Sequence, residues 1–358
     1  MNLNEAYFFV AKSLTISFQE KNKKMIISDI KKNNVNWDQI VRVSTKHKVL
    51  TTLYCIFKRK GVLNFLPREL VEYMKEISQI NRERNNEIIK QANEINKILT
   101  KNNIRPIFIK GAAYLLQNLY YDISERMIGD IDLICSRDDY QKVIDILKND
   151  GYEPVIKKEN RYPEFKHYPR LVKNKRIAAI EIHKELTIEK YSDEFNYGLI
   201  IQDIQNENNV SYLSFENQLN SSIISSQVDD YAFYYKNLDL KNAYDVILLS
   251  KKINKKISFS KFKKIKYILN CFLAATNYTF GEIDSLKYTK TKETEKYLNQ
   301  FIILNKNQKK KILIDELKYK KLYYQNMIYF ICGAIFKKEN RKYLLNRMIE
   351  KIRFNKYL

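Results

Sequence analysis

Hydrophobic residues recur with a helical period in the first hundred residues of the chain. The clearest case is 80–99, where isoleucine, leucine and alanine return every three or four residues among glutamate, lysine and asparagine. This spacing places the apolar side chains along one stripe of a helix and the charged side chains on the opposite side. Residues 1–100 are therefore predicted to form a helical N-terminal region.

The pattern changes near residue 102, where short apolar runs replace the helical period. Strands are predicted at 104–109, 127–134, 152–156, 167–172 and 177–183. Helices are predicted between them at 112–119 and 138–149, and Gly151 ends the second helix. Strands and helices in this order are typical of a small mixed sheet with helices packed against it.

From about residue 217 the helical period returns and continues through the C-terminal third of the chain. We therefore expect an α+β fold, in which a small mixed sheet is flanked by N- and C-terminal helical regions. The predicted domains are a helical region at 1–100, a core at 101–200 and a basic helical domain at 201–358.

Composition narrows the class of protein. Of the 358 residues, 45% are hydrophobic, which is enough for a core, and the 7 Gly and 5 Pro exclude collagen-like and linker-rich chains. The four cysteines form no Cys-x-x-Cys pair, so thiols in a reducing compartment are expected. The N-terminus lacks a basic segment before an apolar stretch, and the late apolar run 327–336 is about half of what a membrane span needs. A cytoplasmic protein without a membrane span is expected.

The charge of the chain is unevenly distributed. The net charge is +23, and residues 251–358 contribute 27 Lys and Arg against 8 Asp and Glu, a net charge of +19. Residues 1–250 contribute only +4. An AT-rich genome explains a general excess of lysine but would spread it evenly along the chain. The C-terminal third is therefore predicted to bind a polyanion, with RNA as the first candidate.

Two aspartates alternate with aliphatic residues in the strand predicted at 127–134. Side chains two residues apart lie on the same face of a strand, about 6.6 Å apart along it. Asp130 and Asp132 would therefore share one face, while Ile131 and Leu133 enter the core. Neighbouring carboxylates repel each other unless a cation neutralises them, and magnesium prefers oxygen ligands of this kind. Two magnesium ions bridged by the pair are the functional interpretation, and a solvated strand with two acids is the alternative.

Lys110 and Gly111 stand where the strand predicted at 104–109 gives way to a helix. A glycine at this point lets the backbone approach a phosphate, and a helix N-terminus adds amide donors and positive potential. The Lys110 ammonium is a candidate phosphate contact. A tight turn with a solvated lysine is the alternative.

A third acidic residue has the same setting between aliphatic residues. Glu181 lies between two isoleucines in the strand predicted at 177–183. It is a candidate third carboxylate of the metal centre, or a base that takes a proton from an attacking hydroxyl. An acid on an edge strand is the alternative. His183 would lie on the same face as Glu181, either as an accessory site residue or hydrogen-bonded within the fold.

The order of these features resembles the DNA polymerase β-like nucleotidyltransferase superfamily. There a glycine turn opens a helix, a D-x-D strand follows, and a later strand carries a further acid. Within this superfamily, the chain resembles the family of uncharacterised nucleotidyltransferases. The matching residues are Ile109 to Ala113, Arg126, Gly129 to Leu133, Gly151 and Tyr152, His167 and Tyr168, and Glu181 to His183. The resemblance covers about 35–250 and is strongest over 107–183.

This resemblance implies an enzyme that moves a nucleoside monophosphate from a nucleoside triphosphate, such as ATP, to an acceptor hydroxyl with release of pyrophosphate. It makes Asp130, Asp132 and Glu181 the catalytic and metal-binding carboxylates, with two magnesium ions as the expected cofactor. It assigns Lys110 and Gly111 to the triphosphate.

The resemblance also gives Arg126 a role, as a contact to a phosphate or to the leaving group. A surface ion pair with Glu125 or Asp122 is the alternative. Ala112 departs from the superfamily pattern, which usually has glycine or serine after the first glycine, so one phosphate contact is missing.

The acceptor is left open between a small molecule, a peptide or protein side chain, and an RNA end. The alternative function is a catalytically silent nucleotidyltransferase fold that binds RNA through its basic C-terminal third. A third class is a peripheral protein on an anionic membrane surface. Three clustered carboxylates are costly to keep in a silent site, which favours the enzyme.

Overall fold

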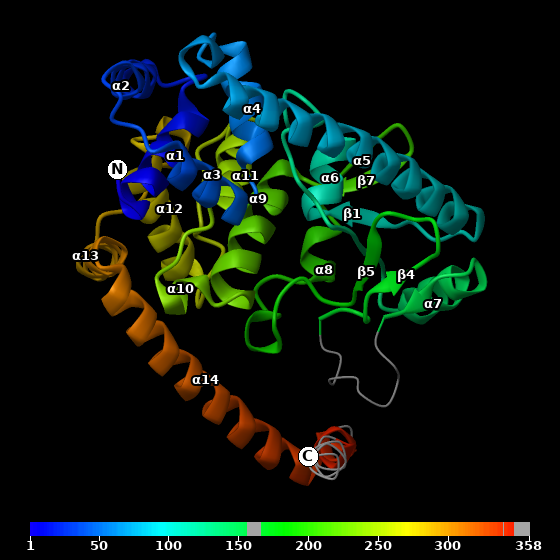
Figure 1. The fold of residues 1–358 in the computed structure, drawn as a ribbon. Helices are drawn as coiled ribbons and strands as arrows, with labels where there is room; N and C mark the ends of the chain where they lie inside the picture. Colours follow the sequence, from blue (N-terminus) through cyan, green and yellow to red (C-terminus); the bar gives the residue numbers. More distant parts are fainter. Residues whose placement is uncertain (156–165, 339, 347–358) are drawn as a thin grey trace, which may run out of the picture.

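The computed structural model describes residues 1–155, 166–338 and 340–346 (Figure 1). Residues 347–358, the end of the predicted C-terminal domain, lie outside the described residues, as does the last residue of the strand predicted at 152–156. The predicted α+β class is confirmed: helices flank a mixed sheet on the N-terminal and C-terminal sides of the chain.

The N-terminal region is helical as predicted. Its helices are α1 (Leu3–Thr15), α2 (Glu20–Lys31), α3 (Trp37–Lys46), α4 (Leu50–Arg59) and α5 (Arg68–Lys101), with a short turn η1 (Leu63–Phe65) before α5. Helix α5 begins directly after Pro67, so it is longer than the stretch 80–99 that the period indicated. Its buried side chains, such as Ile88, Ala92 and Ile95, have the predicted spacing, and α5 packs against α4 and α6.

Within the described residues, the sheet has seven strands in the order β3-β4-β5-β2-β1-β7-β6. The strands are β1 (Ile107–Ile109), β2 (Asp130–Ile134), β3 (Glu153–Pro154), β4 (Leu171–Val172), β5 (Ala179–His183), β6 (Ile204–Glu207) and β7 (Val210–Leu213). Central β2 pairs antiparallel with β1 and parallel with β5. Helices α6 (Lys110–Leu116) and α7 (Tyr140–Asn149) follow β1 and β2 in the chain.

The sheet continues past residue 200, where the sequence placed the end of the core. Strand β7 pairs parallel with β1, and β6 forms the edge beside it. The β6 segment reads Ile-Gln-Asn-Glu and is partly exposed, so it shows no alternation of apolar and polar residues that would have revealed it.

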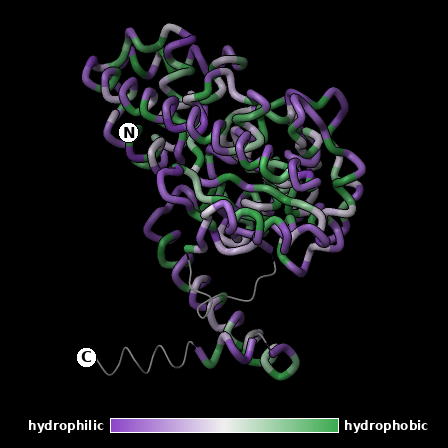
Figure 2. Tube along the Cα trace, turned by 90° about the vertical axis from the view of Figure 1, so that its right-hand side faces the viewer, coloured by the Kyte–Doolittle hydropathy of each residue, from purple (hydrophilic) through white to green (hydrophobic). Residues whose placement is uncertain are grey.

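The short helix α8 (Tyr197–Ile200) precedes β6, and after β7 the C-terminal region is helical as predicted. Its helices are α9 (Phe215–Ile224) with the π-turn η4 (Ser225–Asp229), α10 (Ala232–Tyr235), α11 (Leu240–Ser250), α12 (Lys266–Phe280), α13 (Lys292–Lys306) and α14 (Gln308–Phe336). Helix α1 packs on α12, so the N- and C-terminal helices form one body. Hydrophobic segments gather inside this body, and α14 extends away from it (Figure 2). None of the helices in the described ranges is long and apolar enough to cross a membrane.

Candidate active site

Adjacent strands β2 and β5 bring the predicted acidic residues together. They pair in parallel, with Asp132 opposite Glu181 and Asp130 opposite Ala179. The aliphatic residues that alternate with these acids are fully buried, as the sequence pattern predicted. The three carboxylates therefore lie on one face of the sheet, and the core lies on the other.

The ammonium of Lys110 lies among these groups. Its Nζ is 2.6 Å from Asp132 Oδ1, 4.0 Å from Glu181 Oε2 and 3.3 Å from His183 Nε2. Lys110 is the first residue of α6 and has a φ of 53°, a left-handed conformation that is uncommon for a residue with a side chain. The Lys110 ammonium thus lies inside the acidic cluster, and its backbone adopts a sparsely populated conformation.

Side chains of Asp132, Glu181 and His183 have the geometry of a cation site. Each offers one ligand atom, these atoms lie within 4.8 Å of one another, and all three residues are buried. Asp130 is joined to this group through Arg170, a residue that the sequence did not single out. Arg170 Nη2 lies 3.0 Å from Asp130 Oδ2, and its Nε donates to Glu181 Oε1 at 2.7 Å.

The surrounding charges shift the pKa values of the three carboxyl groups in different directions. Burial raises the pKa of Asp130, with a contribution from the two neighbouring carboxylates. Burial also acts on Asp132, but Lys110 and His183 outweigh it and lower that pKa. The pKa of Glu181 lies well below its usual range because His183, Lys110 and Arg170 together outweigh burial. Asp132 and Glu181 are therefore ionised at neutral pH, as cation ligands must be.

His183 is fully buried, and its two ring nitrogens have different surroundings. Nε2 lies 2.8 Å from Asp132 Oδ1, whereas Nδ1 has no hydrogen-bond partner in the described part of the chain. A buried N–H without an acceptor is costly, so Nε2 is the ring nitrogen that donates to Asp132. His183 thereby fixes the orientation of this carboxylate.

Gly111 is required by close packing. A Cβ atom on this residue would lie 2.6 Å from Ile128 Cγ2 and 3.3 Å from Ile128 Cβ, closer than side chains tolerate. The glycine therefore lets α6 approach the segment that leads into β2. The phosphate contacts expected of Lys110 and Gly111 stay predictions.

Arg126 is buried rather than placed on the surface. Its Nε and Nη2 each donate a hydrogen bond of 2.8 Å to the carboxylate of Asp245 in α11, and Nη1 donates to the carbonyl of Met127. Arg126 is 6% exposed and Asp245 is 1% exposed. The alternative of a surface ion pair with Glu125 or Asp122 is therefore wrong. Contact with phosphate stays a prediction for Arg126, whose guanidinium is committed to Asp245 in this structure.

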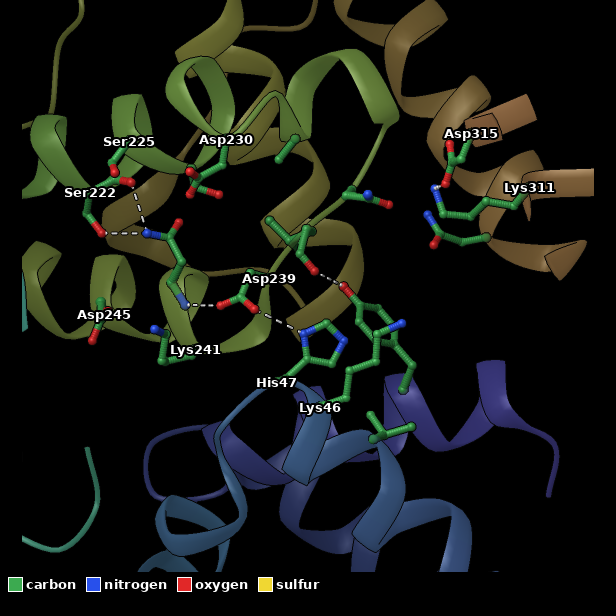
Figure 3. A pocket seen from close by; sticks show the side chains of 18 of the residues that line it. Lys46, His47, Ser222, Ser225, Asp230, Asp239, Lys241, Asp245, Lys311 and Asp315 are labelled. Carbon is green, nitrogen blue, oxygen red and sulfur yellow. Dashed lines mark hydrogen bonds and ion pairs between the residues drawn. The ribbon is translucent and has the colours of Figure 1, made fainter. Parts of the chain in front are cut away.

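A cavity of about 750 Å³ opens beside Lys110, between the N-terminal helices, the core and the C-terminal helices (Figure 3). Its walls include Lys46 of α3, Lys110, Arg126 and Lys241 of α11. The sequence did not reveal this cavity because its residues come from segments far apart in the chain and form no local motif. The sequence did not indicate a role for Arg170 either, because its partners Asp130 and Glu181 are also distant in the chain.

The chain matches the protein-family model described as "Uncharacterised nucleotidyltransferase" over residues 33–279. The matched segment covers more than half of the chain and includes the whole sheet and the acidic cluster. The chain therefore belongs to the uncharacterised nucleotidyltransferase family and is an enzyme of the transferase class, which confirms the resemblance seen in the sequence. Nucleotidyltransferases typically use divalent metal ions, and a buried Asp-Glu-His cluster can hold one. No curated protein and no solved structure matches the chain.

Proposed function

We propose that this enzyme transfers a nucleoside monophosphate from a nucleoside triphosphate, such as ATP, to an acceptor hydroxyl and releases pyrophosphate. Asp130, Asp132 and Glu181 are the proposed ligands of two magnesium ions. Magnesium, when bound to them, neutralises the triphosphate and lowers the pKa of the attacking hydroxyl. Lys110 and Gly111 are the proposed contacts to the triphosphate.

One observation carries this proposal: the acidic cluster already surrounds a cation, the ammonium of Lys110, at 2.6 Å from Asp132 and 4.0 Å from Glu181. Clustered carboxylates that remain ionised in a buried position are a site built for positive charge. Their oxygen atoms are the donors that magnesium prefers.

The surroundings of each residue support a division of roles within the proposed site. Glu181 has a pKa far below neutral, so it is a poor proton acceptor, and the role of metal ligand is favoured over that of base. His183 holds Asp132 in place by hydrogen bonding, and Arg170 holds Asp130 and Glu181. Carboxylates held in this way keep their orientation when a metal cation takes the place of the Lys110 ammonium, which favours catalysis.

The acceptor is proposed to be a small molecule, because the cavity beside Lys110 has the volume of a site for one. An RNA end is the alternative, supported by the net charge of +19 over residues 251–358. A cytoplasmic location is part of the proposal: a reducing compartment suits the free thiols of Cys55, Cys135 and Cys271, all of which are buried.

The proposal is tested by incubating the protein with magnesium and each α-labelled nucleoside triphosphate, together with either a small-molecule extract or total tRNA. Pyrophosphate release and transfer of label to one acceptor class are expected. Asp132→Asn should lower turnover by about 10²–10³-fold or more in protein that circular dichroism shows to be folded. The matched control is Asp138→Asn, because Asp138 is exposed and lies outside the cluster. Equal turnover by Asp132→Asn and the wild type would rule out the proposed site.

A further inference from the structure

The walls of the cavity beside Lys110 carry more positive than negative charge once the ion pairs are taken into account. Arg126 is paired with Asp245 and Lys311 with Asp315. The remaining charged groups on the walls, in addition to Lys110, are Arg42, Lys46 and Lys241 against the carboxylates of Asp230 and Asp239. Asp239 lies 3.3 Å from His47 Nδ1, whereas the described ranges contain no ion pair of Arg42, Lys46 or Lys241.

Lys241 is the most constrained of these cations. It lies in the first turn of α11, is half-buried and lines the cavity, where Figure 3 shows it near Asp245. Arg126 and burial together lower the pKa of Lys241 to about 8, although Asp245 and Asp239 act in the opposite direction. An anion bound at this point would offset the repulsion between the Lys241 ammonium and the buried guanidinium of Arg126.

The sign of this excess indicates what kind of ligand fits. A phosphate group carries about 1.5 to 2 negative charges at neutral pH and offers several acceptor oxygens. Its charge is opposite in sign to the excess of the three cations Arg42, Lys46 and Lys241 over Asp230 and Asp239. The carboxylate of Asp230 lies near enough to influence both Lys110 and Lys241, so the cavity continues from Lys241 towards the catalytic cluster.

We infer that this cavity is a phosphate-binding site in which the ammonium of Lys241 binds a phosphate group of a substrate. The inference rests on the proposed function, because it places a substrate next to the acidic cluster. The phosphate belongs either to the nucleoside triphosphate or to a phosphorylated acceptor, and the chemistry of recognition is the same for both. Arg42 and Lys46 of α3 add positive charge from the N-terminal region, which gives that region a part in binding.

The test is calorimetric titration of the full chain with inorganic phosphate, pyrophosphate and ATP, in low salt and without metal. Lys241→Met should weaken phosphate and pyrophosphate binding about ten- to a hundredfold, because a charge-assisted hydrogen bond is lost. Lys241→Arg should retain binding to within a few-fold. Lys256→Met, which removes one exposed charge outside the cavity, is the matched control and should bind as the wild type does.

The titrations with ATP separate the two sources of the phosphate. Equal weakening of ATP and pyrophosphate binding by Lys241→Met assigns the group to the nucleotide. Weakening of phosphate binding alone, with ATP binding unchanged, assigns it to the acceptor. Unchanged binding of all three probes, or no binding of phosphate or pyrophosphate by the wild type, overturns the inference. Lys241→Met should melt no lower than the wild type, because the repulsion from Arg126 is removed, so a loss of binding reports on the site.

The same titrations in an Asp132→Asn background keep this inference distinct from the proposed function. Phosphate binding should persist there, since no hydrogen bond or ion pair among the described residues joins Lys241 to the acidic cluster. If the Asp132→Asn variant loses metal-dependent turnover but still binds phosphate, both the proposed function and the phosphate site at Lys241 are supported. Phosphate binding that disappears with Asp132 overturns the inference while leaving the proposed function intact.

Discussion

Removal of the Arg126 side chain is expected to destabilise the fold severely. Arg126→Met leaves the carboxylate of Asp245, which is 1% exposed, with a hydrogen bond from the hydroxyl of Tyr120 at 2.6 Å but without its cation. Breaking a buried ion pair from one side costs about 3–5 kcal/mol. With an entropy of unfolding of about 2.1 cal/mol/K per residue, that loss lowers the melting temperature by roughly 4–7 °C for a chain of this length.

Differential scanning calorimetry and urea unfolding measure this effect directly. The matched control is Arg82→Met, since the Arg82–Asp122 pair has a similar distance of 2.9 Å but both side chains are about one-third exposed. An exposed pair contributes about 0.2–1 kcal/mol, so the control should shift the melting temperature by about 1 °C or less. The double variant Arg126→Met with Asp245→Leu should recover most of the loss, because no buried charge is left unpaired.

A small shift in the melting temperature of Arg126→Met, together with a large loss of nucleotide affinity, would refute this reasoning. It would mean that Asp245 releases the guanidinium to a phosphate, as the family resemblance implied. Large destabilisation with nucleotide affinity retained in the folded fraction would establish that the buried pair joins the core to α11 and does not contact the substrate.

Three further predictions concern the cluster itself. Gly111→Ala should lower the free energy of unfolding by about 1–3 kcal/mol, because the added Cβ would lie 2.6 Å from Ile128 Cγ2. Urea unfolding measures this change, and adding Ile128→Ala should restore part of the loss if the clash is the cause. Lys110→Met should raise magnesium affinity in the absence of nucleotide by about tenfold, because the competing ammonium 2.6 Å from Asp132 is removed; unchanged or weaker binding by calorimetry would contradict this. The lowered pKa of Glu181 contributes stability that is fully present above the unfolded-state value of about 4.3 and is lost as pH falls through the folded-state value. The difference in unfolding free energy between the wild type and Glu181→Gln should therefore narrow between pH 6 and pH 3, and a constant difference would argue against the charge interactions described here.

Local patterns in the sequence determined the fold class and the acidic strand. The period of α5 and the alternation of acids with aliphatic residues in β2 and β5 depend only on residues a few positions apart. Such patterns place Asp130 and Asp132 on one face without reference to the rest of the chain. The same alternation around Glu181 predicted its strand, and the family match supports the order of these elements along the chain.

Contacts between distant segments were decided only by the tertiary structure. Whether Arg126 meets phosphate, Glu125 or Asp245 depends on where α11 packs, more than a hundred residues further along the chain. Arg170 reaches Asp130 and Glu181 because β4 lies beside β5, and a single arginine carries no signal of that neighbour. The cavity around Lys241 exists because three separate regions enclose it. The sequence gives the charge of each side chain, but packing determines which group it pairs with and whether it is exposed. The physical reason is that burial and distance determine the strength of every charge interaction.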